Sequence, residues 1–185
     1  AEETDIKLAE LPAPGPTLPS TLRDRFRDGA AGPLMAVIPP GEFTMGTRGF
    51  LPGSGEHPAH RVQVGDFLIG VNEVTFDEYD RFVRATGRRS PDDFGWGRGH
   101  RPIVDVSWID ARDYTLWLSR QTGRHYRLPS EAEWEFAARA GTESAYWWGH
   151  DLEPGIALCF DCGSTWGNRS SAPVGSFAAN PFGIN

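Results

Sequence analysis

The stretch that decides the fold is YRLPSEAEWEFAARAG, residues 126–141, in which boundary signals frame a short helix. Ser130 precedes the helix and is followed three residues later by a glutamate, which is the pattern of a capping box. Glu131 and Glu135 lie early in the helix, where its dipole favours negative charge, and Gly141 follows its end. Capping and dipole matching account for at least two of the three glutamates. Paired catalytic acids would have to face a common cleft, which this spacing does not indicate.

Two further helices are predicted by the same signals. The segments TFDEYDRFVRATG (75–87) and SWIDARDYTLWLSRQTG (107–123) each begin with a hydroxyl residue, carry an acid three positions later and end with glycine. Apolar residues at helical spacing predict which side chains face the core. These are Phe76, Tyr79, Phe82 and Val83 in the first segment, Trp108, Ala111, Tyr114, Trp117 and Leu118 in the second, and Trp134 in the stretch 126–141.

Strands are predicted upstream of these helices. PLMAVIPPGEFTMG (33–46) indicates a strand, a Pro-Pro-Gly turn and a second strand, and HRVQVGDFLIG (60–70) indicates a third strand. Long connections rich in Gly, Pro and Asn surround the few short helices. We therefore expect one α+β domain over residues 33–185 with much irregular structure.

Residues 1–32 are rich in Pro, Ala and charge and contain almost no aromatic side chains, so they are expected to form an extended N-terminal arm. Leu18, Leu22 and Phe26 recur at roughly helical spacing, which suggests contact with the domain or with another protein. An extended arm that orders on a partner is a common way to join subunits. A protein partner bound through this arm is therefore expected.

Composition excludes several classes of function. The 185 residues carry a net charge of -7 with a pI near 5.2, which argues against nucleic-acid and anionic-membrane partners, since these need a basic surface. No apolar run is long enough for a membrane-spanning helix. The sequence starts at Ala1 without methionine, as a mature protein does after signal-peptide removal, so a periplasmic or secreted location is expected.

Several blocks, taken together and in this order, identify a family. They are VIPPGEFTMG (37–46), EHPAHRVQVGDFLIGVNEVTFDEYDRF (56–82), PIVDVSWIDARDYTLWLSRQTGRHYRLPSEAEWEFAARAG (102–141) and SAPVGSFAANPFGIN (171–185). They resemble the formylglycine-generating enzyme family, or sulfatase-modifying factors, whose domain is a variant of the C-type-lectin-like fold. The resemblance covers the first half to two thirds of the family's domain. Members continue into an Asn-Val-Trp-Glu-Trp segment, a Gly-Gly-Ser block and a cysteine pair that binds copper and activates oxygen.

The resemblance implies two functions. Without the copper-binding pair, the chain is expected to be a sulfatase-modifying-factor-like module that acts as a protein-binding, assembly or accessory subunit. The alternative is the N-terminal portion of a copper-dependent formylglycine-generating oxidase acting on sulfatase cysteines. Copper is then expected only if a cysteine pair exists outside this sequence. We assign no catalytic residue, because the family builds its active groove largely from the segment beyond NPFGIN.

The two cysteines, Cys159 and Cys162, lie in one loop, ALCFDCGS. They resemble a Cys-x-x-Cys segment that many bacterial relatives carry, not the catalytic pair. A short disulfide that holds the loop is the preferred interpretation. A zinc site completed by histidines and a pair of free thiols remain alternatives.

The same loop holds Ca²⁺ in many members of the family, through Asn or Asp side chains and backbone carbonyls. Leu158 and Gly167 stand where close relatives commonly have Asn and Asp, so two oxygen ligands are missing. Asp161 and Asn168 are the remaining side-chain candidates for a calcium ion.

Four tryptophans, Trp96, Trp147, Trp148 and Trp166, lie in predicted loops. Aromatic side chains in loops often anchor interfaces, so these four are interface candidates, although burial is an equal alternative. The histidines are interpreted as structural or surface residues.

Overall fold

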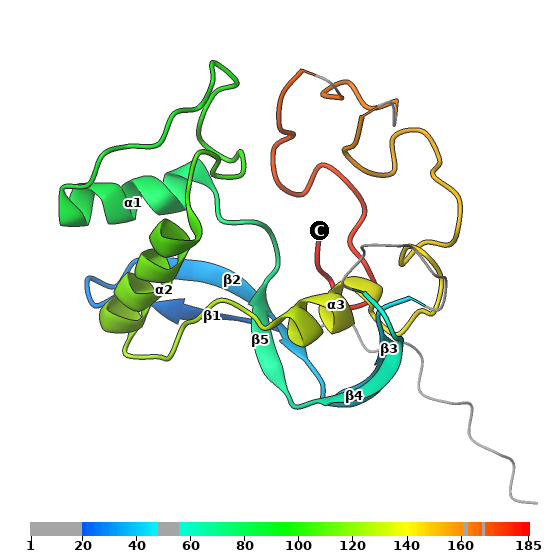
Figure 1. Ribbon diagram of the computed structural model, residues 1–185. Coiled ribbons are helices and arrows are strands. Elements are labelled where there is room, and N and C mark those ends of the chain that lie inside the picture. Colours follow the sequence, from blue (N-terminus) through cyan, green and yellow to red (C-terminus); the bar gives the residue numbers. More distant parts are fainter. Residues whose placement is uncertain (1–19, 48–55, 161–162, 168) are drawn as a thin grey trace, which may run out of the picture.

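The computed structural model describes residues 20–47, 56–160, 163–167 and 169–185, which form short strands, three helices and long loops (Figure 1). The strands make two antiparallel sheets. One has the order β1-β2-β5 and consists of β1 (Thr21–Arg25), β2 (Ala31–Ile38) and β5 (Phe67–Gly70). The other pairs β3 (Gly41–Met45) with β4 (His60–Val64).

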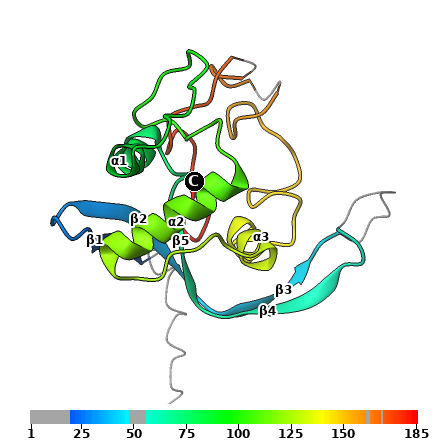
Figure 2. The ribbon, with the colours of Figure 1, turned by 60° about the vertical axis from the view of Figure 1, so that its left-hand side comes forward.

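The two sheets are parts of one ribbon that bends sharply, so that β3 and β4 curve away from the other strands (Figure 2). The bend lies where Pro39 and Pro40 interrupt the ladder, since proline has no N–H to donate. The expected turn after β2 is this bend, and β2 and β3 do not pair with each other. The expected single strand over 60–70 is wrong, because it divides at Gly65 and Asp66 into β4 and β5.

Residues 20–32, which were assigned to the arm, belong to the folded body. Thr21 pairs with Ala36 and Arg23 with Leu34, so this segment is an edge strand, and its charged sequence hid the strand signal. Phe26 is buried just after β1. The helical spacing inferred for this segment is therefore wrong, while residues 1–19 lie outside the described part of the chain.

All three helices begin at a hydroxyl N-cap with a complete capping box, as predicted. They are α1 (Phe76–Thr86), α2 (Trp108–Thr122) and α3 (Glu131–Arg139). The left-handed residue that ends α3 is Ala140, one position before the expected Gly141. In the described part of the chain, none of these helices has the length and apolar character needed to cross a membrane.

Most of the predicted inward faces are confirmed, but two tryptophans are not buried. Trp108 is 66% exposed and Trp134 is 62% exposed. Trp108 is the first residue of α2, and Trp134 lies on the side of α3 away from the buried Phe136. Helical periodicity finds an apolar face but cannot tell whether another element covers it.

The apolar core of the described residues consists of two separate clusters. The first joins β1 to α1 and α2 and contains Phe26, Tyr79, Phe82, Tyr114, Trp117 and Leu118. The second joins the bent ribbon to α3 and contains Ala36, Ile38, Val64, Val71 and Phe136. A domain of this size ordinarily has one contiguous core, so the space between the clusters is the feature that positions the site.

Candidate binding groove

A groove of about 1030 Å³ opens among the elements that carry the two clusters. Its walls come from the β1-β2-β5 sheet, from α1 and α2, from the segment 124–134 and from the C-terminal residues, which Figure 1 shows around the point marked C. Apolar residues of both clusters line it, among them Leu34 and Ile69 on one side and Ile103 and Val106 on the other. The groove thus exposes apolar surface of both cores.

The charged groups along the groove are largely engaged with one another. The Tyr126 hydroxyl donates to Asp24 Oδ2 over 3.0 Å, and Arg124 Nε lies 3.6 Å from Asp24 Oδ1. Burial and the bond to this carboxylate raise the pKa of Tyr126 far above its usual value. These contacts join β1 to the segment after α2, across about a hundred residues of sequence.

The glutamates of α3 have structural partners. Glu133 accepts hydrogen bonds from the Ser130 N–H at 2.8 Å and from both terminal nitrogens of Arg127, at 2.7 and 2.6 Å. Glu135 accepts from the Gly46 N–H at 3.0 Å and from Arg139 Nε at 2.8 Å, which holds α3 against the end of β3. Capping explains the first of these glutamates, and a contact between elements explains the second.

Replacing Glu133 with glutamine is expected to lower the free energy of unfolding by about 1 kcal/mol at pH 6, since solvent screens the pair. The Arg127 guanidinium, with the Ser130 N–H and hydroxyl, lowers the pKa of Glu133 to about 2. A pKa below the unfolded value of 4.5 means that this stabilisation is full above about pH 4.5 and is lost as the pH falls toward 2. Urea titrations of wild type and E133Q should therefore differ at pH 6 and converge at pH 2.5.

The matched control is E131Q, at the exposed first residue of the same helix. E131Q should leave the change in the free energy of unfolding between pH 6 and pH 2.5 the same as in wild type. An E133Q protein that keeps the full acid sensitivity of wild type contradicts the assignment.

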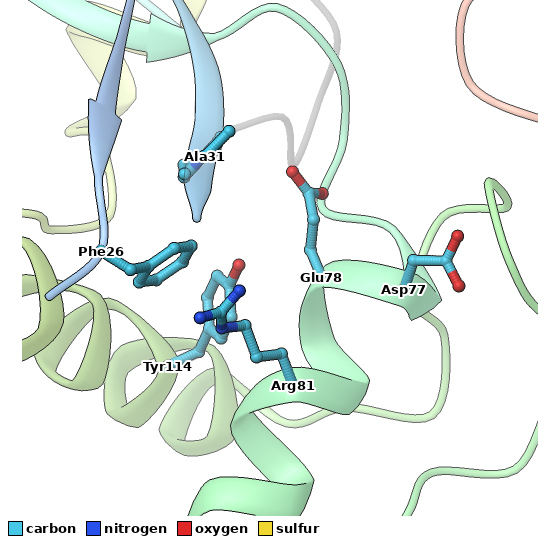
Figure 3. A pocket seen from close by; sticks show the side chains of 8 residues that line it. Phe26, Ala31, Asp77, Glu78, Arg81 and Tyr114 are labelled. Carbon is cyan, nitrogen blue, oxygen red and sulfur yellow. The ribbon is translucent and has the colours of Figure 1, made fainter. Parts of the chain in front are cut away.

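A side pocket of about 170 Å³ adjoins the groove and shares Pro33, Asp77, Glu78 and Tyr114 with its lining (Figure 3). Tyr114 is 4% exposed and lines this pocket. Burial, with the Glu78 carboxylate nearby, raises the pKa of Tyr114, so the hydroxyl stays protonated. Figure 3 shows this hydroxyl directed into the pocket between Ala31 and Glu78.

The four candidate interface tryptophans do not line the groove but lie in the loops 88–107 and 141–178. Trp96 is half-exposed beside Phe94, with ring centroids 5.5 Å apart. Trp148 stacks on Tyr146 at 4.8 Å and meets Trp147 edge-on. Trp166 meets Phe177 edge-on at 6.2 Å, as packed aromatic pairs do.

Sequence analysis missed the residues that form the groove. Tyr114 is in the core, as predicted, and also lines the groove, whereas Trp134 was predicted to be buried and instead is exposed along the groove. The groove exists because the elements around it do not pack against one another, and the periodicity of a single element cannot predict this.

The loop candidates for a disulfide and for calcium are only partly described. Cys159 lies in a described loop, whereas Asp161, Cys162 and Asn168 lie outside the described residues, so the disulfide and the calcium site stay predictions. The described residues that line the groove include no cysteine and therefore do not fit a copper site with thiolate ligands. No three of the described His, Cys, Asp and Glu side chains are grouped as metal ligands.

Residues 23–185 match the family model described as sulfatase-modifying factor enzyme 1-like domain, so the chain belongs to this family. The formylglycine-generating enzyme of Thermomonospora curvata is 30% identical over 81% of this chain and 66% of its own length. The formylglycine-generating enzyme of Streptomyces coelicolor is 31% identical over 80% of this chain and 63% of its own length. The inactive C-alpha-formylglycine-generating enzyme 2 of Mus musculus is 32% identical over 68% of this chain and 54% of its own length. The chain thus spans about half to two thirds of the length of these relatives.

Solved structures confirm the fold. PvdO from Pseudomonas aeruginosa superimposes with a TM-score of 0.70 and 31% identity, over 91% of this chain and 70% of that one. Treponema denticola variable protein 1 shares the fold with a TM-score of 0.66 and 20% identity, over 90% of this chain and 72% of that one. The predicted fold, α+β and the formylglycine-generating-enzyme variant of the C-type-lectin-like fold, is therefore correct.

Proposed function

We propose that this chain is a sulfatase-modifying-factor-like module that acts by binding another protein, as an assembly or accessory subunit. The observation that carries the proposal is that the loops 88–107 and 141–178 carry six of the twelve large apolar side chains that are exposed in the described part of the chain. They are Phe94, Trp96, Tyr146, Leu152, Leu158 and Phe160. Exposed aromatic and aliphatic side chains gathered in one region are typical of protein-binding surfaces.

The two loops lie side by side at one end of the molecule in both ribbon views (Figures 1 and 2). The Val174 N–H donates to the His100 carbonyl over 2.9 Å, and Arg101 donates to the Ser171 carbonyl, so the loops are joined at their bases. A partner that contacts one loop is therefore close to the other. Rigid aromatic pairs such as Phe94 with Trp96 offer contact area at a low entropic penalty.

The test is isolation of the tagged protein from its source at native abundance, followed by light scattering and native mass spectrometry. We expect a complex of fixed stoichiometry with a different protein. The variant Trp96→Ser should weaken the complex by about tenfold or more. Leu116→Ser is the matched control, because Leu116 is also exposed, at 45%, but lies on α2 outside both loops. A monomer in every preparation, or equal effects of both variants, contradicts the proposal.

The alternative function is the N-terminal portion of a copper-dependent oxidase that converts sulfatase cysteines to formylglycine. It is supported by the partial coverage of the relatives named formylglycine-generating enzyme. Mass spectrometry of a cysteine-containing sulfatase peptide, incubated with copper, oxygen and the protein as isolated from its source, distinguishes the two. Aldehyde formation would favour the oxidase, whereas we expect none.

A further inference from the structure

A basic surface lies where β1 meets the end of α2, although the net charge of the protein is -7. The two elements are in contact there, because the Arg27 N–H donates to the Gln121 carbonyl over 3.0 Å, and both ribbon views show them side by side (Figures 1 and 2). We call the exposed arginines of this surface the basic face. They are Arg23, Arg25, Arg27, Arg120 and Arg124.

The two acids of β1 and the turn after it are already engaged. Asp28 forms an ion pair with Arg81 of α1. The side chain of Asp24 is only 19% exposed, and its carboxylate accepts from the Tyr126 hydroxyl. Within the basic face only Arg124 approaches an acid, with its Nε 3.6 Å from Asp24 Oδ1, and the other four arginines form no ion pair with a described residue. Most of the positive charge of the basic face is therefore uncompensated.

Protection of a strand edge does not account for this charge. β1 is the outer strand of its sheet, and charge on an open edge discourages pairing with other chains. Charge of either sign gives that protection, and it does not explain why the arginines continue beyond β1 to the end of α2. A basic surface on an acidic protein favours an acidic partner.

Residues 1–19 have the opposite charge and are joined directly to β1. Residues 11–19 carry no charge and contain four prolines, whereas residues 2–10 contain Lys7 and four acids. The chain enters the described structure at Ser20, whose carbonyl accepts from the Val37 N–H over 2.9 Å. The four acids are Glu2, Glu3, Asp5 and Glu10.

The sequence also provides the length to bring these acids to the basic face. Pro14-Gly15-Pro16 is a turn signal, and Gly15 lies five residues from Ser20 and five from Glu10. A chain that reverses at Gly15 would return to the start of β1 at Glu10, so that residues 2–10 run beside the strand. Nine extended residues span about 30 Å, which exceeds the roughly 17 Å of a five-residue strand.

We propose that residues 2–10 dock on the basic face of the same molecule. A short tether gives an effective concentration on the order of millimolar, so several surface ion pairs that are weak one by one are enough to hold the segment. The docked segment would cover the open edge of β1 together with Arg23 and Arg124, which border the groove. This contact does not involve the loops 88–107 and 141–178, so it and the proposed protein binding can fail independently.

The single lysine of the sequence makes the test direct. An amine-reactive nitroxide attaches only within residues 1–19, at Lys7 or at the N-terminus, and it broadens the amide NMR signals of the surface that it approaches. At about 20 mM salt we expect the signals of Arg25 and Gln121 to fall at least about twofold and to recover at about 0.5 M salt, where screening is strong. The signal of Val37, beside the point of attachment, should change little with salt.

Matched variants of the full chain separate docking from simple tethering. Neutralising the acids in E2Q/E3Q/D5N/E10Q should abolish the broadening at Arg25 and Gln121. Its control, E131Q/E143Q/D151N/E153Q, makes the same change of net charge at other exposed acids and should leave the broadening intact. On the basic face R27Q/R120Q should weaken the broadening, whereas the control R89Q/R169Q, at exposed arginines of the loops, should not.

A peptide of ten glutamates measures whether the basic face is occupied. Because the docked segment competes with it, the peptide should bind wild type about tenfold more weakly than E2Q/E3Q/D5N/E10Q. Equal affinities overturn the proposal and leave the basic face open to an external acidic protein. Broadening that is insensitive to salt and to neutralisation overturns it as well. So does broadening of an isotope-labelled chain by a separate nitroxide-labelled chain, since the occupant would then come from a second copy.

Discussion

Replacing Asn180 with alanine is expected to lower the free energy of unfolding by about 2–4 kcal/mol, because a buried amide with several partners is lost. Asn180 is 7% exposed, and its Nδ2 donates to the Ala137 carbonyl at the end of α3 over 2.8 Å. Its Oδ1 accepts from the N–H groups of Phe182 and Ile184, at 2.9 and 3.2 Å. One side chain thus holds the C-terminal turn against the second core cluster, and alanine leaves these backbone groups without partners.

Urea unfolding at pH 7 measures the effect, and amide exchange shows where it acts. The N–H groups of Phe182 and Ile184 should exchange freely in the alanine variant, while those of α1 should not. Asn180→Asp keeps the acceptor for both N–H groups but removes the donor to Ala137, so its effect should be intermediate. Asn185→Ala removes a single exposed contact with Asn72 and should change stability by less than about 0.5 kcal/mol. A loss below 1 kcal/mol for Asn180→Ala would show that the turn is held by other contacts.

Asn180 illustrates what can be predicted from this sequence. The helices were predicted because their signals are local: a hydroxyl, an acid three residues later and a left-handed residue at the end are all within one segment. Asn180 has no such signal, since its importance depends on a carbonyl 43 residues away. Its neighbours in ANPFGIN only indicate a turn.

The candidate groove was beyond sequence reasoning for the same reason. Its walls include β1, whose strand signal is weak because TLRDR is polar, and which is defined by pairing with β2. The contact between Asp24 and Tyr126 joins parts of the chain that no local pattern relates. Trp134 is exposed because no element in the described part of the chain covers it. An amphipathic pattern shows which face of a helix is apolar, but not whether another element packs on that face. The family resemblance predicted the fold, whereas only the three-dimensional structure shows that two cores border an open groove.

Replacing Phe82 with alanine is expected to have the largest effect of any change considered, a loss of about 3–5 kcal/mol in the free energy of unfolding. Phe82 is 2% exposed and lies at the centre of the first cluster. Its ring is 5.2 Å from that of Tyr79, 5.7 Å from that of Tyr114 and 5.6 Å from that of Trp117, centroid to centroid. Truncation would leave a cavity that three large rings cannot close. Val83→Ala, at the partly buried neighbouring position, is the control and should lose about 1 kcal/mol.

The same position tests whether the groove separates the cores. Phe82→Leu in the first cluster and Phe136→Leu in the second should destabilise additively, within about 0.5 kcal/mol, because the two residues share no packing partner in the described clusters. Urea denaturation of the two single variants and the double variant gives the coupling energy, and the milder substitutions keep the double variant folded. A coupling above about 0.5 kcal/mol would mean that the clusters behave as one core and that the groove does not divide them.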